Sequence, residues 1–266
     1  MYQVFYSRAL VFIIILQCII CDVYGSNTIR GPHRLGIGPE IYFMQRKKDG
    51  GSSQRGFMFG ARAQYDRIRP NSIYWGGEGQ WAVGTLCGHN ADHDQLRSRK
   101  RDSEIEGRLG YTWRKKLGCN LWLTPFAGWG YFEGTNKFMH PSPLEYKITN
   151  SFSYLLTGFL WRFDIKPFFS LGLNFKAKYS TGAKSHITDD PNPEINNVCL
   201  IIEDKFSYNL DIPLYFDFCC GRRKFEITFV PFYHFRHYGA HENHPFDFID
   251  TRFHMYGARL MFNCIF

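Results

Sequence analysis

The stretch from Lys205 to Phe218 reads KFSYNLDIPLYFDF, and apolar and polar residues alternate along it. Large apolar side chains stand at every even position, and mostly polar residues stand at the odd positions between them. Because a β-strand sends successive side chains to opposite faces, this pattern predicts one strand with an apolar face and a polar face. A strand in a soluble protein usually has about five or six residues, and a tilted strand needs roughly nine to eleven to cross a bilayer. This stretch is longer than either.

The same alternation recurs along the chain after residue 26. It predicts ten strands, which we place at roughly 35–47, 56–68, 72–86, 103–113, 120–133, 145–163, 167–180, 205–218, 223–237 and 251–266. The links between these strands alternate between long and short. Transmembrane β-barrels have such links, with short turns at one end and longer loops at the other, whereas a two-sheet sandwich has no reason to follow this order. We therefore predict an all-β fold, an antiparallel transmembrane β-barrel of about ten strands.

The composition supports this class and excludes others. The chain has 266 residues, of which 44% are hydrophobic, 21% are charged and 18% are aromatic, with 25 Gly and 12 Pro. Such a mixture favours strands and turns over helices and does not fit disorder. The mean hydropathy is negative, which excludes a polytopic helical membrane protein. The formal net charge of +8 fits a nucleic-acid partner or a surface that faces anionic lipid or glycan.

The amino terminus carries a pattern typical of export. Residues 9–20 read ALVFIIILQCII, an apolar run that is too short to span a bilayer and has the length of a signal-peptide core. Val23 and Gly25 suit the −3 and −1 positions of a cleavage site, so we predict a signal peptide at residues 1–25. Residues 26–34 are then a periplasmic lead-in, and residues 35–266 form the barrel domain. A buried apolar strand or helix is the alternative interpretation of the run.

The carboxyl terminus ends on Phe266, and apolar residues stand at every second position behind it, from Tyr256 to Cys264. This pattern resembles the carboxy-terminal targeting strand of bacterial outer-membrane β-barrel proteins, and the resemblance covers roughly residues 35–266. It implies an outer-membrane location, periplasmic N- and C-termini, and insertion by the barrel-assembly machinery with Phe266 as a targeting residue. The segments YWGGEG (74–79), PFAGWGY (125–131) and HYGAHEN (237–243) resemble uncharacterised barrels of chlamydia-type bacteria, which implies no known activity.

The polar faces of the predicted strands carry charges of both signs, which we expect to face the lumen. These residues are Glu40, Arg46, Arg62, Asp66, Glu78, Glu104, Glu106, Arg108, Lys176, Lys178, Asp211, Asp217, Lys224, Glu226 and Arg236. A ten-strand barrel is little wider than the eight-strand barrels whose interiors their own side chains fill. Opposite charges inside it are expected to pair, which argues against a wide aqueous pore.

Four histidines follow one another at the end of the ninth predicted strand and in the last long loop: His234, His237, His241 and His244. The spacing of His237 and His241 suits a metal ion on a helix, but this segment is predicted to be strand and loop. The four are therefore weak metal candidates, and a polar rim with pH-dependent charge is the favoured interpretation. We expect no metal site and no cofactor.

Two charged runs fall in the loop predicted between the third and fourth strands. Residues 97–101 (RSRKR) are expected to contact anionic lipopolysaccharide or surface glycan. We expect no nucleic acid as a partner, because the run is not interleaved with aromatic residues on a stacking platform. Residues 92–94 (DHD) lie where ten-stranded outer-membrane proteases place their acidic residues and histidine, although acidic loops are usually only solvated. Hydrolase and nucleotide-binding motifs are absent from the sequence, so an enzyme is the less favoured interpretation.

Aromatic residues and cysteines also follow the predicted topology. Trp75, Trp113, Trp122 and Trp161 fall near the predicted periplasmic rim, where tryptophan is favoured at a membrane interface; the alternative is the core of a β-sandwich. The periplasmic side also receives Cys119, Cys219, Cys220 and Cys264, whereas Cys87 and Cys199 fall in long loops opposite. We predict disulfides within the group of four, either inside one barrel or between neighbouring barrels, and free thiols are the alternative.

These patterns together predict an outer-membrane barrel with a structural or surface-interaction, adhesin-like role. The expected partners are outer-membrane lipid and lipopolysaccharide, the barrel-assembly machinery, and host-surface or envelope proteins. A narrow porin-like channel or a carrier of a small ligand is the alternative function. A protease or lipid-modifying enzyme at the barrel rim is the third.

Overall fold

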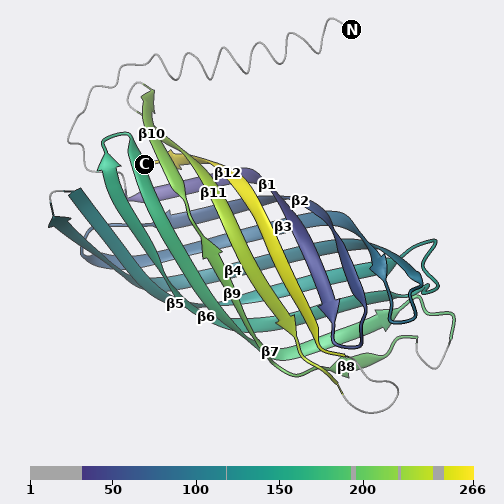
Figure 1. Ribbon diagram of the computed structural model, residues 1–266. Helices are drawn as coiled ribbons and strands as arrows, with labels where there is room; N and C mark the ends of the chain where they lie inside the picture. Colours follow the sequence, from purple (N-terminus) through teal and green to yellow (C-terminus); the bar gives the residue numbers. More distant parts are fainter. Residues whose placement is uncertain (1–31, 118, 193–195, 221–222, 242–248) are drawn as a thin grey trace, which may run out of the picture.

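The computed structural model describes residues 32–117, 119–192, 196–220, 223–241 and 249–266, and these residues form a β-barrel (Figure 1). The strands are β1 (His33–Lys48), β2 (Ser53–Arg67), β3 (Ser72–His89), β4 (Gln95–Leu117), β5 (Cys119–Phe138), β6 (Lys147–Lys166), β7 (Phe169–Thr188), β8 (Cys199–Ile201), β9 (Phe206–Asp211), β10 (Leu214–Cys220), β11 (Arg223–Tyr238) and β12 (Thr251–Ile265). None of the described residues belongs to a helix long and apolar enough to cross a membrane. The predicted signal peptide lies outside the described residues.

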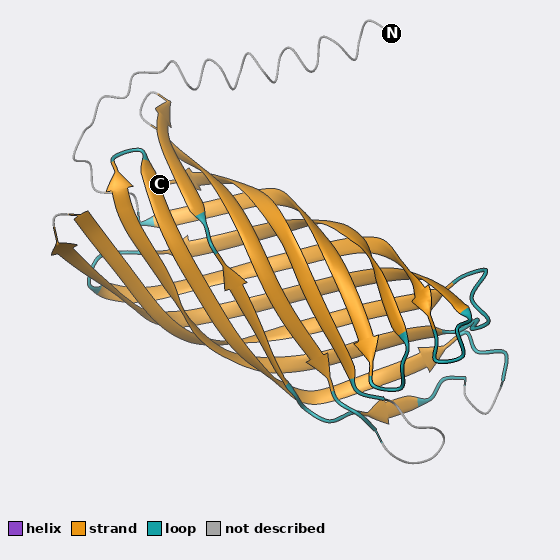
Figure 2. Cartoon of the chain, in the orientation of Figure 1, coloured by secondary structure: helices purple, strands orange, loops and turns teal. Residues whose placement is uncertain are grey.

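The strands pair antiparallel in chain order, and β12 pairs with β1, so the sheet closes on itself (Figure 2). β9 and β10 both lie between β7 and β11 and together act as one barrel strand. β8 adds only three residues to the edge of β7. The result is a closed antiparallel barrel of ten strands, which confirms the predicted fold class.

The two ends of the barrel differ in their links. At one end, here called the short-turn end, the links are residues 68–71, 118, 167–168 and 221–222. At the other, the long-loop end, they are residues 49–52, 90–94, 139–146, 189–205 and 239–250. The first two of these long-loop links are shorter than predicted, because the strands beside them continue further than the sequence pattern indicated.

The fourth strand shows why the pattern underestimates strand length. β4 has 23 residues, from Gln95 to Leu117, whereas the predicted strand runs only from residue 103 to residue 113. In the added part, Ser98 and Lys100 are buried inside the barrel and Arg97, Arg99 and Arg101 are exposed on its outer surface. Both faces are polar there, so the contrast between apolar and polar positions disappears although the alternation of the side chains continues.

The stretch that decides the fold contains an interruption at Pro213. Proline has no backbone N–H, so the ladder between β9 and β10 is broken at this point. The neighbouring bonds remain, since Gly172 N donates to Pro213 O at 2.8 Å and Ile212 N donates to Pro231 O at 3.0 Å. The alternation also persists across the break, with Phe206, Ile212 and Phe216 exposed on the outer surface.

The outer surface of the barrel is largely apolar, and three of the four predicted interface tryptophans lie on it. Trp75, Trp113 and Trp161 are exposed near the short-turn end. Trp122 is only 9% exposed, faces the lumen and donates a hydrogen bond from Nε1 to Asp164 Oδ2 at 3.0 Å. Its assignment to the interface was wrong, because its neighbour Leu123 takes the outward position. Where two adjacent residues are both apolar, the sequence does not show which of them faces outward.

Candidate functional site: the barrel interior

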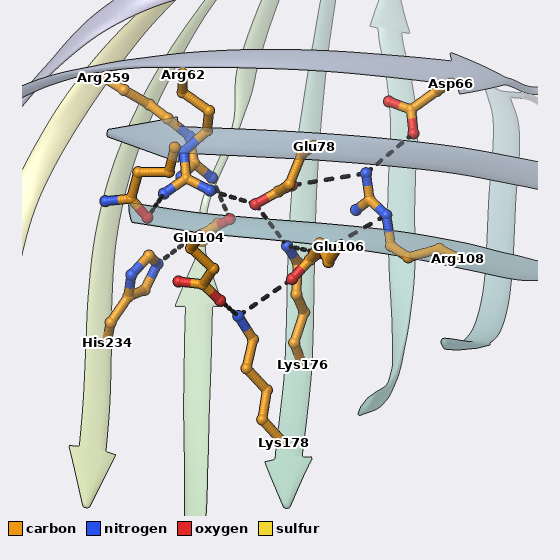
Figure 3. A network of polar contacts seen from close by, with 12 residues as sticks. Arg62, Asp66, Glu78, Glu104, Glu106, Arg108, Lys176, Lys178, His234 and Arg259 are labelled. Carbon is orange, nitrogen blue, oxygen red and sulfur yellow. Dashed lines mark hydrogen bonds and ion pairs between the residues drawn. The ribbon is translucent and has the colours of Figure 1, made fainter. Parts of the chain in front are cut away.

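Charged side chains from three strands meet near the middle of the lumen (Figure 3). Lys176 Nζ on β7 lies 2.9 Å from Glu78 Oε1 on β3 and 2.6 Å from Glu106 Oε1 on β4. Lys178, two residues further along β7, donates to Glu104 and lies 3.1 Å from Glu106. Each charge is therefore adjacent to opposite charges, and all five side chains are largely removed from solvent.

Arg62 extends this network toward β1. Its Nε donates to Glu40 Oε2 at 3.0 Å, and its two terminal nitrogens donate to Glu78 and to Gln80, the latter at 2.7 Å. Gln80 in turn donates to Glu40. A guanidinium presents five donors in a planar fork, so one arginine can hold several acceptors in fixed positions. Arg62 thus joins the polar faces of three neighbouring strands.

Asp66 connects the middle of the lumen to the short-turn end. It lies 3.0 Å from Arg34 and 3.2 Å from Arg108, and it accepts a hydrogen bond from the Tyr74 hydroxyl at 2.7 Å. Arg108 also lies 3.6 Å from Glu78, which links this group to the central lysines. The carboxylate has three donors around it, as a buried charge requires if it is to remain stable.

A second carboxylate gathers donors closer to the short-turn end. Glu226 on β11 accepts hydrogen bonds from Arg162 at 2.6 Å, from Arg34 at 3.2 Å and from Asn263 at 3.2 Å. Arg162 also lies 3.4 Å from Asp217. Since Arg34 contacts both Asp66 and Glu226, the two groups form one continuous network.

Asp211 holds the third group, near the place where β9 ends. The Nε2 of His234 lies 2.9 Å from one oxygen of Asp211, and Arg259 donates to the other oxygen. All three side chains are buried in the lumen. The histidine is therefore a partner in the ion-pair network.

One glycine makes room for an aromatic side chain across the network. A Cβ at Gly130 would lie 2.3 Å from the ring of Tyr154, so only glycine allows the ring to pass over β5 at this point. The Tyr154 hydroxyl then donates to Glu104 at 2.6 Å and lies 3.2 Å from Glu106. The ring thereby brings a hydroxyl donor to both central carboxylates.

The lumen changes character toward the long-loop end. A further ion-pair group stands there, with Asp102 lying 3.0 Å from Lys100 and 2.8 Å from Arg236. Among these charges, Phe132, Phe152 and Tyr238 pack with ring centroids 5.0 and 5.8 Å apart along the series, and the Arg236 guanidinium lies 3.8 Å from the centroid of the Phe132 ring. We call the buried apolar residues at this end the apolar plug; they include Met44, Leu86, Leu96, Phe132, Phe138, Ile148, Phe152, Ile187, Leu200, Ile202, Tyr238 and Phe253.

The plug seals the lumen at the long-loop end, and a pocket lies in the half toward the short-turn end. Leu200 in β8 and Ile202, both in the segment between β7 and β9, are each 3% exposed, so this segment contributes to the seal. The pocket is lined by members of the ion-pair network together with Trp122, Leu160 and Ile265. Side chains therefore occupy most of the interior from the middle to the long-loop end, where a smaller pocket is lined by Glu104, Phe132 and Tyr154, whereas the short-turn half retains a larger hollow.

Comparison with known proteins places this architecture in a recognised class. The outer-membrane protease OmpT of Escherichia coli superposes with a TM-score of 0.54 at 11% identity, over 91% of this chain and 100% of that chain. The transport unit of the autotransporter AIDA-I, also from Escherichia coli, gives a TM-score of 0.51 at 9% identity, over 93% of this chain and 94% of that chain. The fold is that of a bacterial outer-membrane β-barrel protein. No protein-family model and no curated protein matches the chain.

Within this outer-membrane barrel fold, the charges predicted to face the lumen lie on its inner side. Thirteen of the predicted positions belong to the groups described above: Glu40, Arg62, Asp66, Glu78, Glu104, Glu106, Arg108, Lys176, Lys178, Asp211, Asp217, Glu226 and Arg236. Lys224 is half-buried at the start of β11, opposite Cys219 of β10. The lumen also holds charges that were not predicted to face it, chiefly Arg34, Lys100, Asp102, Arg162 and Arg259; Lys100 was predicted in an outer loop.

The overlooked charges had a usable signal in the sequence. Arg259 occupies the face of the last strand opposite the apolar row that ends at Phe266, so alternation alone places it inside. Lys100 and Asp102 continue the phase of Glu104 and Glu106, but the predicted strand began only at residue 103. Extending each strand while its inward phase stays polar would have found them.

The histidines do not come together. His234 faces the lumen, while His237, three residues on, faces outward with its Nε2 3.4 Å from Asp250. The Nδ1 of His241 donates to the carbonyl of Ile201 at 2.7 Å. His244 lies outside the described residues, and no group of three metal-binding side chains occurs among those that are described.

The acidic run at residues 92–94 forms part of a turn. Asp94 N donates to Asn90 Oδ1 at 2.8 Å, and Asn90 Nδ2 donates to Asp94 Oδ2 at 2.9 Å. His93 adopts a positive φ of 67°, a conformation common in tight turns. These contacts give the run a role in closing the link between β3 and β4.

Cysteines occupy both ends of the barrel, and Cys87 in β3 and Cys199 in β8 lie in strands and not in the long loops where they were predicted. Cys219 near the end of β10 and Cys264 near the end of β12 are free thiols at the short-turn end, where the backbones of Cys119 and Cys220 also lie. The ladder separates Cys219 from Cys264 by the whole of β11, about 10 Å between backbones at the usual strand spacing. A disulfide needs Cα atoms within about 7 Å, so these two cannot bond within one barrel in this conformation.

Proposed function

We propose that this chain is an outer-membrane barrel that does not conduct and that serves a structural or surface-interaction role. The filled lumen is the observation that carries the proposal. An aqueous path would have to pass both the ion-pair network and the apolar plug. Breaking a buried ion pair by removing one partner costs about 3–5 kcal/mol, and the interior contains many linked pairs. The filled interior makes the barrel a rigid support for the loops at its long-loop end.

Single-channel conductance in planar bilayers tests this function. We expect the refolded protein to insert without resolved conductance steps. A variant that combines Phe132→Ser, Phe152→Ser and Tyr238→Ser in the plug with Arg62→Ser, Lys176→Ser and Lys178→Ser in the network opens both barriers and should conduct, which shows that insertion is detectable. Leu155→Ala, an outward-facing change on β6, is the matched control and should remain silent. Regular conductance steps from the unaltered protein would support the narrow-channel alternative and refute the proposal.

The orientation and location follow from the same proposal. The short-turn end and both termini would face the periplasm, and the long-loop end would face outward toward lipopolysaccharide and host or envelope proteins. The terminal residue takes part in closing the barrel, since Phe266 N donates to His33 O and His33 N donates to Phe266 O, both at 3.0 Å. The Phe266 ring is 59% exposed and stacks on the His33 ring with centroids 5.5 Å apart.

Two variants separate targeting from closure of the barrel. Phe266→Ala removes the ring and keeps both backbone hydrogen bonds, whereas deletion of Phe266 removes both. We expect each variant to be exported normally and to reach the outer membrane in reduced amount by cell fractionation. Unchanged outer-membrane levels for Phe266→Ala would show that the ring carries no targeting information.

A further inference from the structure

The basic run at residues 97–101 is not a loop, and its side chains divide between two environments. Arg97, Arg99 and Arg101 lie exposed on the outer face of β4, while Ser98 and Lys100 point into the lumen. Alternate residues on one face of a strand are about 7 Å apart. The three guanidinium groups therefore form a column of about 13 Å along the outside of the barrel.

Neighbouring strands widen this column into a patch. Cys87 on β3 pairs with Arg55 on β2 and with Arg97 on β4, so the two arginines stand in one row across three strands. On the other side, Lys137 of β5 stands directly opposite Arg99. We call Arg55, Arg97, Arg99, Arg101 and Lys137 the outer basic face; it spans about 15 Å across four strands.

The arginines of the outer basic face form no ion pairs among the described residues, although the exposed Glu133 on β5 stands diagonal to Arg101. Among the described residues, no carboxylate lies within ion-pair distance of any of these four arginines. Lys137 pairs with Asp189 at 3.5 Å, but both side chains are more than half exposed, and such pairs contribute little. The lumen shows the contrast, because nearly every arginine there has a carboxylate partner. The unpaired positive charge is thus a feature of this face.

Apolar side chains stand beside the arginines on the neighbouring strands. Phe57 on β2 stands in the row of Arg99, and Phe59 stands in the row of Arg101. Trp81, one row further along β3, is also exposed on the outer surface. Cations and large apolar groups thus lie side by side on this face, which matches a molecule that has an anionic head and hydrocarbon chains.

We propose that the outer basic face binds a phosphorylated glycolipid of the outer leaflet, with its phosphates on the arginines and its acyl chains along Phe57, Phe59 and Trp81. Arginine binds phosphate through two parallel charge-assisted hydrogen bonds. The arginines are spread over about 13 to 15 Å. This spacing favours a lipid whose headgroup has more than one phosphate over a lipid that has a single phosphate. The placement beside the outer leaflet rests on the orientation proposed above, whereas the binding chemistry does not.

Binding to the purified, refolded protein in detergent micelles tests the proposal. The probes are bis-phosphorylated lipid A, the same lipid after removal of both phosphates, and phosphatidylglycerol, with the bound lipid counted by native mass spectrometry. We expect lipid A to bind in preference to the other two. The variant Arg97→Ser, Arg99→Ser, Arg101→Ser should bind it at least about tenfold more weakly, because several charge-assisted hydrogen bonds are lost.

Two controls separate a phosphate site from general attraction. Lys184→Glu changes an exposed, outward-facing cation on β7 and should leave lipid A binding unchanged. Replacement of the three arginines by lysine should restore part of the binding, since lysine keeps the charge but not the paired hydrogen bonds. A heat-modifiable gel shift shows that each variant is folded.

Equal binding of the dephosphorylated lipid would overturn the proposal in favour of apolar contact alone. Equal binding of phosphatidylglycerol would overturn it in favour of a nonspecific anionic surface. Unchanged affinity in the folded serine variant would refute the assignment of these residues. None of these results depends on whether the barrel conducts, so they are independent of the conductance test.

Discussion

Replacement of Glu106 by alanine tests whether the ion-pair network holds the barrel interior together. The Glu106 carboxylate is fully buried, lies 2.6 Å from Lys176 and 3.1 Å from Lys178, and accepts from the Tyr154 hydroxyl at 3.2 Å. The variant removes this acceptor and leaves both ammonium groups with one carboxylate neighbour fewer. Lys176 keeps Glu78 as a partner, and Lys178 keeps Glu104.

The expected cost follows from this arrangement. Removing one member of a buried ion pair costs about 3–5 kcal/mol. Because each lysine keeps another carboxylate, we expect the lower end, about 3 kcal/mol of unfolding free energy. Glu106→Gln retains the shape and part of the hydrogen bonding, so it should cost less than the alanine variant. The exposed pair between Arg252 and Asp49, at 2.9 Å, is the matched control, and Arg252→Ala should cost about 0.2–1 kcal/mol.

Urea unfolding in lipid vesicles, followed by tryptophan fluorescence, measures these differences. Added salt should diminish the Arg252→Ala effect and leave the Glu106→Ala effect nearly unchanged, since buried charges are screened less. Equal costs for the two variants would refute the inference that the lumen pairs are shielded from water. A stabilised Glu106→Ala variant would show that the network is a net burden on the fold.

Two further predictions test the membrane face and the cysteines. Leu210 on β9 belongs to the outward apolar row, so Leu210→Arg should lower the unfolding free energy in a bilayer by about 2–4 kcal/mol. Thr149→Arg, outward on the long-loop part of β6, should lower it by about 0–1 kcal/mol. Equal costs in the urea titration in lipid vesicles would contradict the assigned membrane face. Any disulfide that joins Cys219 to Cys264 should link two chains, so non-reducing gels of envelopes should show a reducible dimer that Cys264→Ser diminishes. A mapped bond between these two cysteines in a monomer band would contradict the strand register.

The sequence was sufficient for the features that depend on alternation. A barrel strand shows one face to lipid and the other to the lumen, so an apolar row such as that from Phe206 to Phe218 determines both the strand and its orientation about its axis. The number of strands, their antiparallel order and most of the inward charges followed from the same rule. Pro213 did not disturb the prediction because the side chains keep their phase across the break.

The tertiary structure decided what alternation cannot express. Strand length at the long-loop end was underestimated because both faces of β4 are polar there, and Trp122 was placed outside because Leu123 beside it is equally apolar. Partners within the lumen, such as Arg62 with Glu78 or Asp211 with Arg259, depend on register and on closure between distant strands. Closure brings β12 beside β1, and only then does the interior become a continuous ion-pair network sealed by an apolar plug. Contacts between residues far apart in the chain depend on three-dimensional distance, which a local sequence period does not contain.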